Sequence, residues 1–354
     1  MPKYIAILGS IMSGLGKGVL SASIGKMLKS SSYTVSMLKF DGYLNVDCGT
    51  MNPFRHGEVF VLSDGSEVDV DFGTYERFLD ISLDGNSSLT GGKIFSSIIR
   101  KERKGDYLGR DVQFIPHVTD YIIEHIRRNA SNSDISLIEV GGTVGDIENS
   151  YFIEALRQLS RKDDVLFIQL THLPDLYGEL KTKPTQQANK ILLRMGITPH
   201  IIIARTNKEM DIETKKKIAS YCNVEERDVF NDLEVGNVYE LPLFLEKEGL
   251  HNALARHLKI DVKPQLQAWK ERASRINRGK EVKIGVVGKY VKQVDSYASL
   301  REALVHAGTE SNAVPIVEFI DAEDITEDKL RGYDGVIIPG GFGKRGIDGK
   351  MKAI

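Results

Sequence analysis

Short apolar runs alternate with amphipathic stretches of helical length along most of the chain. The runs are rich in β-branched and aliphatic side chains, which is typical of buried strands. A broad apolar face recurs at helical spacing over about residues 17–30 and predicts a helix there. This alternation predicts an α/β fold with a mostly parallel sheet covered by helices on both faces. The expected strands lie at residues 4–8, 35–39, 136–140, 165–170 and 200–204.

A second alternating region begins near residue 282. Residues 267–283 are highly charged and predict a helix that runs into an exposed linker. The region that follows predicts a helix over about residues 295–308. Its expected strands lie at residues 283–287, 315–320 and 335–338.

Length and composition change this picture in a few respects. Because 354 residues exceed one ordinary core, we expect a domain at 1–265, a linker at 266–281 and a partial domain at 282–354. A formal net charge of −2 gives no electrostatic case for nucleic-acid binding, and no apolar run approaches membrane-spanning length. Cys48 and Cys222 form neither a disulfide framework nor a CxxC metal site. They favour packing roles in a reducing, cytoplasmic compartment.

The stretch GSIMSGLGKG follows the first expected strand. Gly14, Gly16 and Gly18 allow backbone N–H groups to face one concavity at a helix N-terminus, and Lys17 adds a charge for terminal phosphates. The usual phosphate-loop pattern would have glycine in place of Ile11, and Ser or Thr in place of Gly18 to help hold magnesium. A packing turn is the alternative for such a loop alone. Combined with the strand and helix, the pattern favours nucleotide phosphate binding.

The missing hydroxyl implies that metal ligands come from elsewhere. Asp69 and Asp71 alternate in SEVDVDFGTYERF and would share one face if that stretch were extended. Glu139 ends a very apolar strand, where a lone buried charge would be costly. Since Mg²⁺ prefers a few carboxylates with phosphate oxygens and water, Asp71 and Glu139 are candidate ligands. A salt bridge with Lys17 or Lys39 is the alternative.

Several stretches, in this order along the chain, resemble the signatures of one family. They are SGLGKG (13–18), DGYLNVDCGTMNPFRHGEVFVLSDGSEVDVDFGTYERF (41–78), RKERKGDYLG (100–109), IEVGGTVGDIE (138–148), KTKPTQ (181–186) and PGGFGKRG (339–346). Together they resemble CTP synthases and cover nearly the whole chain. The resemblance implies a P-loop-type amidoligase domain followed by the start of a flavodoxin-like class I glutamine amidotransferase domain. In such enzymes ATP phosphorylates the 4-oxygen of UTP, and ammonia obtained from glutamine then displaces phosphate.

The resemblance also implies roles for individual residues. Lys17 and Lys39 would stabilise charge on the transferring phosphoryl group, while Asp71 and Glu139 would bind Mg²⁺. ATP would be bound by Gly14, Leu15, Gly16, Lys17, Gly18, Asp71 and, near adenine, Val235. UTP, or CTP as feedback inhibitor, would be bound by Ser13, Asp146, Ile147, Glu148, Lys181, Thr182, Lys183, Pro184, Thr185, Gln186 and Lys217. Without the resemblance, KTKPTQ alone would be interpreted as solvated surface.

The final region carries one glutaminase signature. Gly341 matches the family's glutamine-binding glycine. Class I glutaminases also need a cysteine on a G-x-C-x-G turn, with a later His and acid, and neither Cys48 nor Cys222 has that setting. We therefore expect a truncated glutaminase domain without a nucleophile, and CTP synthesis from free ammonia instead of glutamine.

The resemblance further implies a homotetramer, with GTP as an activator of the glutaminase step. A dethiobiotin-synthetase-like ligase or a partitioning-type ATPase would share the deviant loop, but would have no reason to carry GGTVGDIE or KTKPTQ. A catalytically incomplete fragment that binds nucleotide, or that co-assembles with full-length subunits, would carry every signature. Only an activity measurement separates this last alternative from the enzyme.

Overall fold

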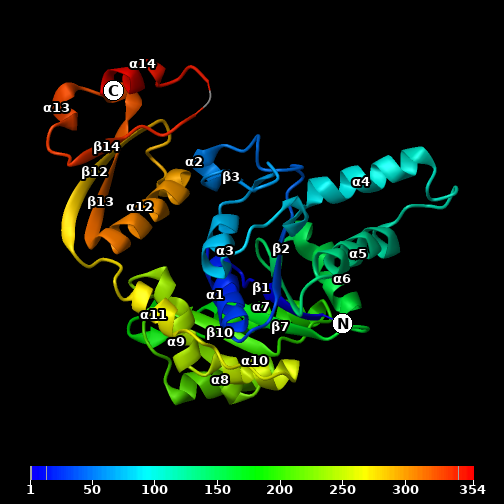
Figure 1. The fold of residues 1–354 in the computed structure, drawn as a ribbon. Coiled ribbons are helices and arrows are strands. Elements are labelled where there is room, and N and C mark those ends of the chain that lie inside the picture. Colours follow the sequence, from blue (N-terminus) through cyan, green and yellow to red (C-terminus); the bar gives the residue numbers. More distant parts are fainter. Residues whose placement is uncertain (1, 13, 342) are drawn as a thin grey trace. The chain divides into compact units, whose positions relative to one another are not determined.

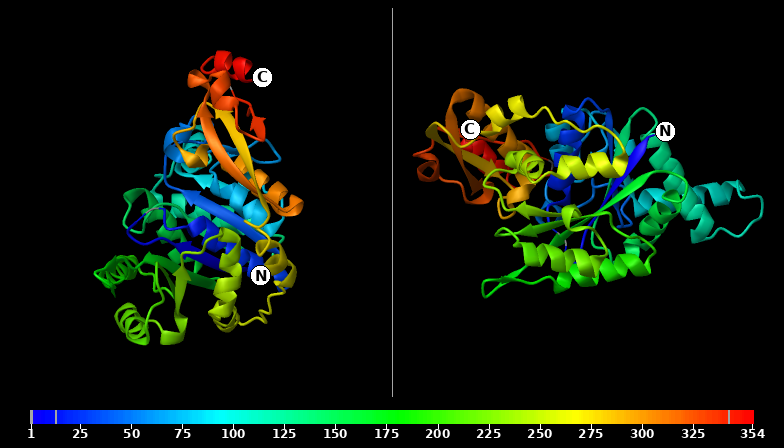
Figure 2. Two further views of the ribbon diagram at one scale, coloured as in Figure 1. Left: turned by 90° about the vertical axis from the view of Figure 1, so that its left-hand side faces the viewer. Right: turned by 90° about the horizontal axis from the view of Figure 1, so that it is seen from below.

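The computed structural model describes residues 2–12, 14–341 and 343–354, which form two compact units (Figures 1 and 2). Unit 1 consists of Met1–Asp47, Leu62–Ser66 and Thr74–Leu266. Unit 2 consists of Cys48–Val61, Glu67–Gly73 and Gln267–Ile354. Unit 2 thus includes two short segments from an early part of the chain, which a linear division near residue 265 does not anticipate.

In the described part of the chain, unit 1 is built on a seven-stranded parallel sheet (Figure 1). The strand order is β11-β10-β7-β1-β6-β2-β5, with β1 at the centre. The strands are β1 Lys3–Leu8, β2 Val35–Asp41, β5 Ser88–Thr90, β6 Ile135–Val140, β7 Val165–His172, β10 Ile201–Thr206 and β11 Val229–Leu233. The predicted α/β class is confirmed, and the five strands expected in this region are present with small shifts at their ends.

Helices cover both faces of this sheet (Figure 2). The helix expected over residues 17–30 is confirmed as α1 Lys17–Ser30. The others are α3 Asp71–Leu79, α4 Gly91–Lys104, α5 Thr119–Asn129, α6 Ser150–Leu159, α7 Lys183–Arg194, α8 Ile212–Cys222, α9 Leu241–Lys247 and α10 Leu250–Leu258. Shorter turns are η1 Gly85–Ser87, η2 Phe114–Val118, η3 Ile147–Asn149, η4 Glu226–Asp228 and η5 Val238–Glu240, with a small hairpin of β8 Asp175–Leu176 and β9 Glu179–Leu180.

The core of unit 1 explains why the apolar runs form strands. On one face, Tyr4 and Phe40 of the sheet share a cluster with Phe152 of α6. On the other face, Gly25 lets α1 approach closely, because a Cβ there would lie 2.8 Å from Cδ1 of Leu137. Burial of alternate residues on both faces removes a large apolar area from water, which is the main favourable term in folding.

The described residues of unit 2 form a three-stranded parallel sheet in the order β13-β12-β14. Its strands are β12 Lys280–Gly288, β13 Ala313–Asp321 and β14 Gly335–Ile337. Its helices are α2 Pro53–His56, α11 Gln267–Ala273, η6 Val294–Tyr297, α12 Ala298–Ser311, η7 Ala322–Asp324, α13 Glu327–Leu330 and α14 Ile347–Ala353. A two-stranded hairpin of β3 Phe60–Val61 and β4 Glu67–Val68 completes the unit. All three strands expected after residue 282 are present.

Side-chain contacts explain why residues 48–61 belong to unit 2. The ring of Phe54 lies edge-on to that of Tyr290 at 5.1 Å, and the guanidinium of Arg345 covers both rings. Glu58 accepts a hydrogen bond of 2.6 Å from the backbone N–H of Ser299, at the start of α12. These contacts tie α2 and the following residues to the C-terminal sheet.

Candidate nucleotide-binding site

The glycine-rich loop connects the central strand β1 to α1 and lies at the carboxyl edge of the sheet. Gly14 and Gly16 have φ angles of +72° and +85°, in the left-handed region that favours glycine. Gly16 is the N-cap of α1, which begins at Lys17. The first N–H groups of α1 lack helical partners, and the helix dipole favours an anion there. The loop therefore has the backbone geometry of a phosphate site.

Lys17 extends from this loop toward the neighbouring strand β6. Its Nζ donates a hydrogen bond of 2.7 Å to the carbonyl oxygen of Gly142, just beyond that strand. Gly9 is needed for this close approach, because a Cβ there would lie 2.9 Å from both of these atoms. Lys17 is buried, so its ammonium group is held at the loop instead of extending into solvent.

Glu139 occupies the sheet beside the loop. Its side chain is 1% exposed, and its Oε2 accepts hydrogen bonds from Ser21 Oγ at 2.9 Å and Tyr75 Oη at 2.7 Å. Lys39 of β2 is the register partner of Glu139 on β6, so the two buried side chains lie on the same face of adjacent strands. The structure thus brings Lys17, Lys39 and Glu139 to one edge of the sheet.

The expectation that Asp69 and Asp71 share a face of an extended stretch is wrong. Asp71 is the first residue of α3, and its backbone N–H donates to Asp69 Oδ1 at 2.9 Å. A short acidic side chain readily makes this kind of local bond and starts a helix, which ends the extended conformation. Asp71 and Tyr75 lie four residues apart, on one face of α3.

The turn after β6 is held by its own polar groups. Asp146 accepts a hydrogen bond of 2.7 Å from the Thr143 N–H, and Asn149 Nδ2 donates to the carbonyl oxygens of Gly141 and Thr143. Ile147 and Glu148 follow Asp146, and Ile147 projects into solvent. The predicted nucleotide residues 146–148 therefore belong to a fixed turn that exposes part of its surface.

KTKPTQ is only partly the solvated surface that its composition suggests. Lys183 is exposed, but Thr185 and Gln186 are buried at the start of α7. The hydroxyl of Thr185 lies 2.9 Å from that of Thr171, which donates to Ser10 Oγ at 3.2 Å. This chain of hydroxyl groups links α7, through β7, to Ser10 at the start of the glycine-rich loop.

Two lysines of the predicted pyrimidine-nucleotide site lie close to one carboxylate. Lys181 Nζ pairs with Glu179 Oε2 at 2.5 Å. The hydrogen bond and charge of Lys181, with a smaller contribution from Lys217, hold the pKa of Glu179 below its usual value. Lys217 on α8 is therefore within electrostatic reach of the β8–β9 hairpin, although it lies far from Lys181 in the sequence.

The remaining predicted residues are distributed as follows. Val235 follows β11 and is half-buried at the same carboxyl edge of the sheet. Ser13 lies outside the described residues. Gly341 belongs to unit 2, where a Cβ on it would lie 3.5 Å from Cε of Lys289. Both cysteines are buried, and burial raises the pKa of Cys222 to about 12, which agrees with a packing role.

Sequence reasoning missed two polar residues at this edge. Arg205 lies near the end of β10, and Asp232 is its register partner on β11. The guanidinium of Arg205 lies beside Gly16, because a Cβ on that glycine would be 3.1 Å from Arg205 Nη1. The available signal was a charged residue at the end of the apolar run IIIART, which alone does not identify a partner.

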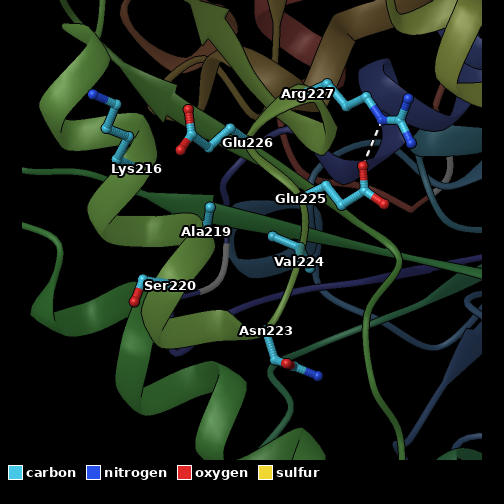
Figure 3. A pocket seen from close by; sticks show the side chains of 8 residues that line it. All are labelled: Lys216, Ala219, Ser220, Asn223, Val224, Glu225, Glu226 and Arg227. Atoms are coloured by element: carbon cyan, nitrogen blue, oxygen red, sulfur yellow. Dashed lines mark ion pairs between the residues drawn. The ribbon is translucent and has the colours of Figure 1, made fainter.

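The pocket drawn in Figure 3 is separate from this edge. It has a volume of about 880 Å³ and is lined by the end of α8 and the turn that precedes β11. Glu225 and Arg227 in its lining pair with each other at 2.6 Å. Because the pocket lies at the amino end of β11, it is opposite the edge where ligands bind in parallel α/β folds.

Within residues 2–12, 14–341 and 343–354, the structure has neither a cluster of metal-binding side chains nor a membrane-spanning helix. No group of three or more His, Cys, Asp or Glu side chains is arranged to hold a metal ion. A Mg²⁺ site here would use fewer protein ligands and complete its shell with phosphate oxygens and water, as Mg²⁺ commonly does. No helix in the same ranges combines the length and apolar character needed to cross a bilayer.

Comparison with known proteins gives consistent results. A family model described as CTP synthase N-terminus matches residues 3–260, and one described as glutamine amidotransferase class-I matches residues 292–354. A CTP synthase from Thermococcus gammatolerans is 47% identical over 364 residues, covering 100% of this chain and 68% of that protein. A CTP synthase from Symbiobacterium thermophilum is 48% identical over 372 residues, covering 100% and 69%, respectively.

Proposed function

This chain belongs to the CTP synthase family, and on that premise we propose that it catalyses the ATP-dependent amination of UTP to CTP. The observation that carries the proposal is the convergence of Lys17, Lys39 and Glu139 beside a loop with the backbone geometry of a phosphate site. Positioning and charge neutralisation account for most of the catalysis of phosphoryl transfer, and these groups supply both.

The phosphate loop would hold the ATP triphosphate. Backbone N–H groups over residues 14–18 point toward bound oxygens, and Lys17 exchanges its hydrogen bond to Gly142 for one to a phosphate. Lys39 adds a second positive charge near the transferring group. Asp71 and Glu139 would hold Mg²⁺, which when bound neutralises phosphate oxygens. The hydroxyl groups of Ser21 and Tyr75 support that role, because they fix the orientation of the Glu139 carboxylate.

The pyrimidine nucleotide would bind between the 146–148 turn, the 181–186 segment and Lys217. Lys181 and Lys217 would hold the triphosphate, which is identical in UTP and CTP, so one basic site would accept substrate and feedback inhibitor. The hydroxyl chain from Thr185 to Ser10 supports a fixed spacing between this segment and the phosphate loop. Such spacing favours in-line transfer between the two nucleotides.

The proposed reaction has two steps. The 4-oxygen of UTP attacks the γ-phosphorus of ATP, forming a P–O bond and releasing ADP. Ammonia then attacks C4, a C–N bond forms, the C–O bond breaks and inorganic phosphate leaves. Gly341 would contact glutamine in a glutaminase reaction, but the 354 residues contain no cysteine in a G-x-C-x-G setting. We propose that this chain uses free ammonia and forms a tetramer as the family does, and we expect no activation by GTP, because GTP acts on the glutaminase step in the family.

The test is CTP formation by the purified chain with ATP, UTP, Mg²⁺ and ammonium chloride. We expect CTP to form at a rate that rises with pH as the NH₃ fraction grows, and neither CTP nor glutamate to form with glutamine as donor. Lys17→Ala should abolish the reaction. Absence of CTP with ammonium, while ATP and UTP still bind, would contradict the proposal and favour a nucleotide-binding fragment.

A further inference from the structure

Arg205 carries a guanidinium group to the phosphate loop from the far side of β7. The strand order places β10 two strands from β1, and Arg205 lies near the carboxyl end of β10. Its Nη1 would contact a Cβ on Gly16 at 3.1 Å, so it lies against the residue that caps α1. The side chain is 27% exposed, which leaves part of the guanidinium accessible at the loop.

Asp232 is the acidic partner of the Arg205 side chain. It is 0% exposed, it is the register partner of Arg205, and its Oδ2 lies 3.5 Å from Arg205 Nη1. The other carboxylate oxygen, Oδ1, is buried without a hydrogen-bond partner. A buried acid paired in this way is commonly no more stabilising than a well-packed apolar residue, so stability alone gives a weak reason for its presence.

The geometry gives a better reason. A guanidinium group has five N–H donors in a rigid plane, and one side of that plane is enough for a carboxylate. The nitrogen beside Gly16, Nη1, is the one that faces Asp232, and because it carries two N–H donors, a single contact with Asp232 leaves one of them for a phosphate oxygen at the loop. Two separate features favour glycine at position 16. Its φ of +85° lies in the left-handed region, and a side chain there would meet Arg205.

We propose that Arg205 is a further binding residue for the triphosphate held by the glycine-rich loop, and that Asp232 is a positioning residue that acts through Arg205. This inference rests on the proposed function, because it takes ATP as the ligand of the loop. It adds a third cation, beside Lys17 and Lys39, that approaches the phosphates from the opposite side of β1.

Calorimetric titration of the full 354-residue chain with ATP and Mg²⁺ tests the proposal. Arg205→Gln should raise the Kd for ATP about tenfold, which corresponds to one charge-assisted hydrogen bond, and Arg205→Lys should lie between it and the unmodified chain. Asp232→Asn should raise the Kd about threefold, with little further effect in the Arg205→Gln background, because Asp232 acts only through that arginine.

Arg256→Gln is a matched control. Arg256 pairs with Asp228, another acid that is almost fully buried, but this pair lies at the amino end of β11, away from the loop. Arg256→Gln should therefore leave the Kd for ATP unchanged.

Failure of the unmodified chain to bind ATP would contradict the proposed function itself. If that chain binds ATP, three results would overturn the inference alone: an unchanged Kd for Arg205→Gln, an equal loss for Arg256→Gln, or fully additive losses for Arg205→Gln and Asp232→Asn.

Discussion

At the scale of single residues, the two carboxylates proposed to hold Mg²⁺ have different surroundings. Glu139 receives two hydroxyl hydrogen bonds inside the sheet, whereas Asp71 begins a helix whose first turn is capped by Asp69. The two hydroxyl groups fix the orientation of the Glu139 carboxylate, whereas the position of Asp71 depends on the start of α3.

Asp71→Asn should abolish CTP formation while the fold survives. A neutral amide is a weaker ligand for Mg²⁺ than a carboxylate, so the proposed site would lose the cation that neutralises phosphate oxygens, a role typically worth several kcal/mol of transition-state stabilisation. The measurement is turnover with ammonium at saturating Mg²⁺. Asp69→Asn is the control and should remain active, because Asn also caps helices well. Undiminished turnover in Asp71→Asn would rule out its role as a ligand.

Asp232 makes stability depend on pH. Burial, with a smaller contribution from Glu234, raises the pKa of Asp232 to about 6 against the opposing effect of Arg205. Because the pKa of Asp232 in the folded chain lies above the unfolded value of 3.8, its stabilising effect is complete below pH 4 and is lost as pH rises through 6. At neutral pH, ionisation of Asp232 lowers the free energy of unfolding by about 3 kcal/mol.

Asp232→Asn should therefore become more stable relative to the unmodified chain as pH rises from 4 to 7. Asparagine carries no charge at any of these values, so the cost of burying the ionised carboxylate disappears. Urea unfolding of both chains at several pH values measures the difference. A difference that stays constant with pH would mean that Asp232 does not titrate in this range.

At the scale of elements, α8 presents neighbouring lysines to different surroundings. Lys217 influences Glu179 on the β8–β9 hairpin, while Lys216 pairs with Glu213 and lines the pocket in Figure 3. Successive residues on a helix point about 100° apart, so this division follows from helical geometry. The two positions therefore provide a matched comparison on one element.

Lys217→Ala should weaken UTP and CTP binding together, by roughly tenfold, because both nucleotides carry the same triphosphate. Lys216→Ala should leave both affinities unchanged. Equilibrium dialysis with each labelled nucleotide gives the two Kd values. Loss of affinity for one nucleotide alone would refute the shared basic site.

The elements differ in how well the sequence predicts them. The central strands and α1 were predictable because their apolar residues recur at fixed local spacing. Strand β5 is too short for a clear pattern, and β11 includes the polar residues Asn231 and Asp232. The start of α3 depends on a cap by Asp69, and the Arg205 contact joins residues far apart in sequence. Sequence periodicity reports neither kind of contact.

At the scale of the whole molecule, the two units differ in the size of their cores. The described cluster of unit 2 has four buried members, Val287, Ile320, Ala322 and Ile325, whereas a single cluster of unit 1 spans both sheet and helices. Stability rises with the apolar area that is buried. Unit 2 is therefore expected to open at lower free energy than unit 1.

Limited proteolysis should cut first within residues 270–281 or 340–350. These segments adjoin or belong to the less stable unit, and proteases attack chains that open locally. Mass spectrometry of the earliest fragments identifies the sites. A first cut inside residues 74–265, which belong to unit 1, would contradict the lower stability of unit 2.

The central position of β1 has a consequence for synthesis of the protein. Lys3 pairs with Ile135 and Tyr4 with Val165, so β1 has no partner in the sheet until more than a hundred further residues have been made. Until then its apolar side chains face the nascent chain or a chaperone. Long-range parallel pairing of this kind is slow, because loop closure precedes any gain from contact. The strand at the centre of the finished sheet is thus enclosed on both sides only when β7 has been made, long after its own synthesis.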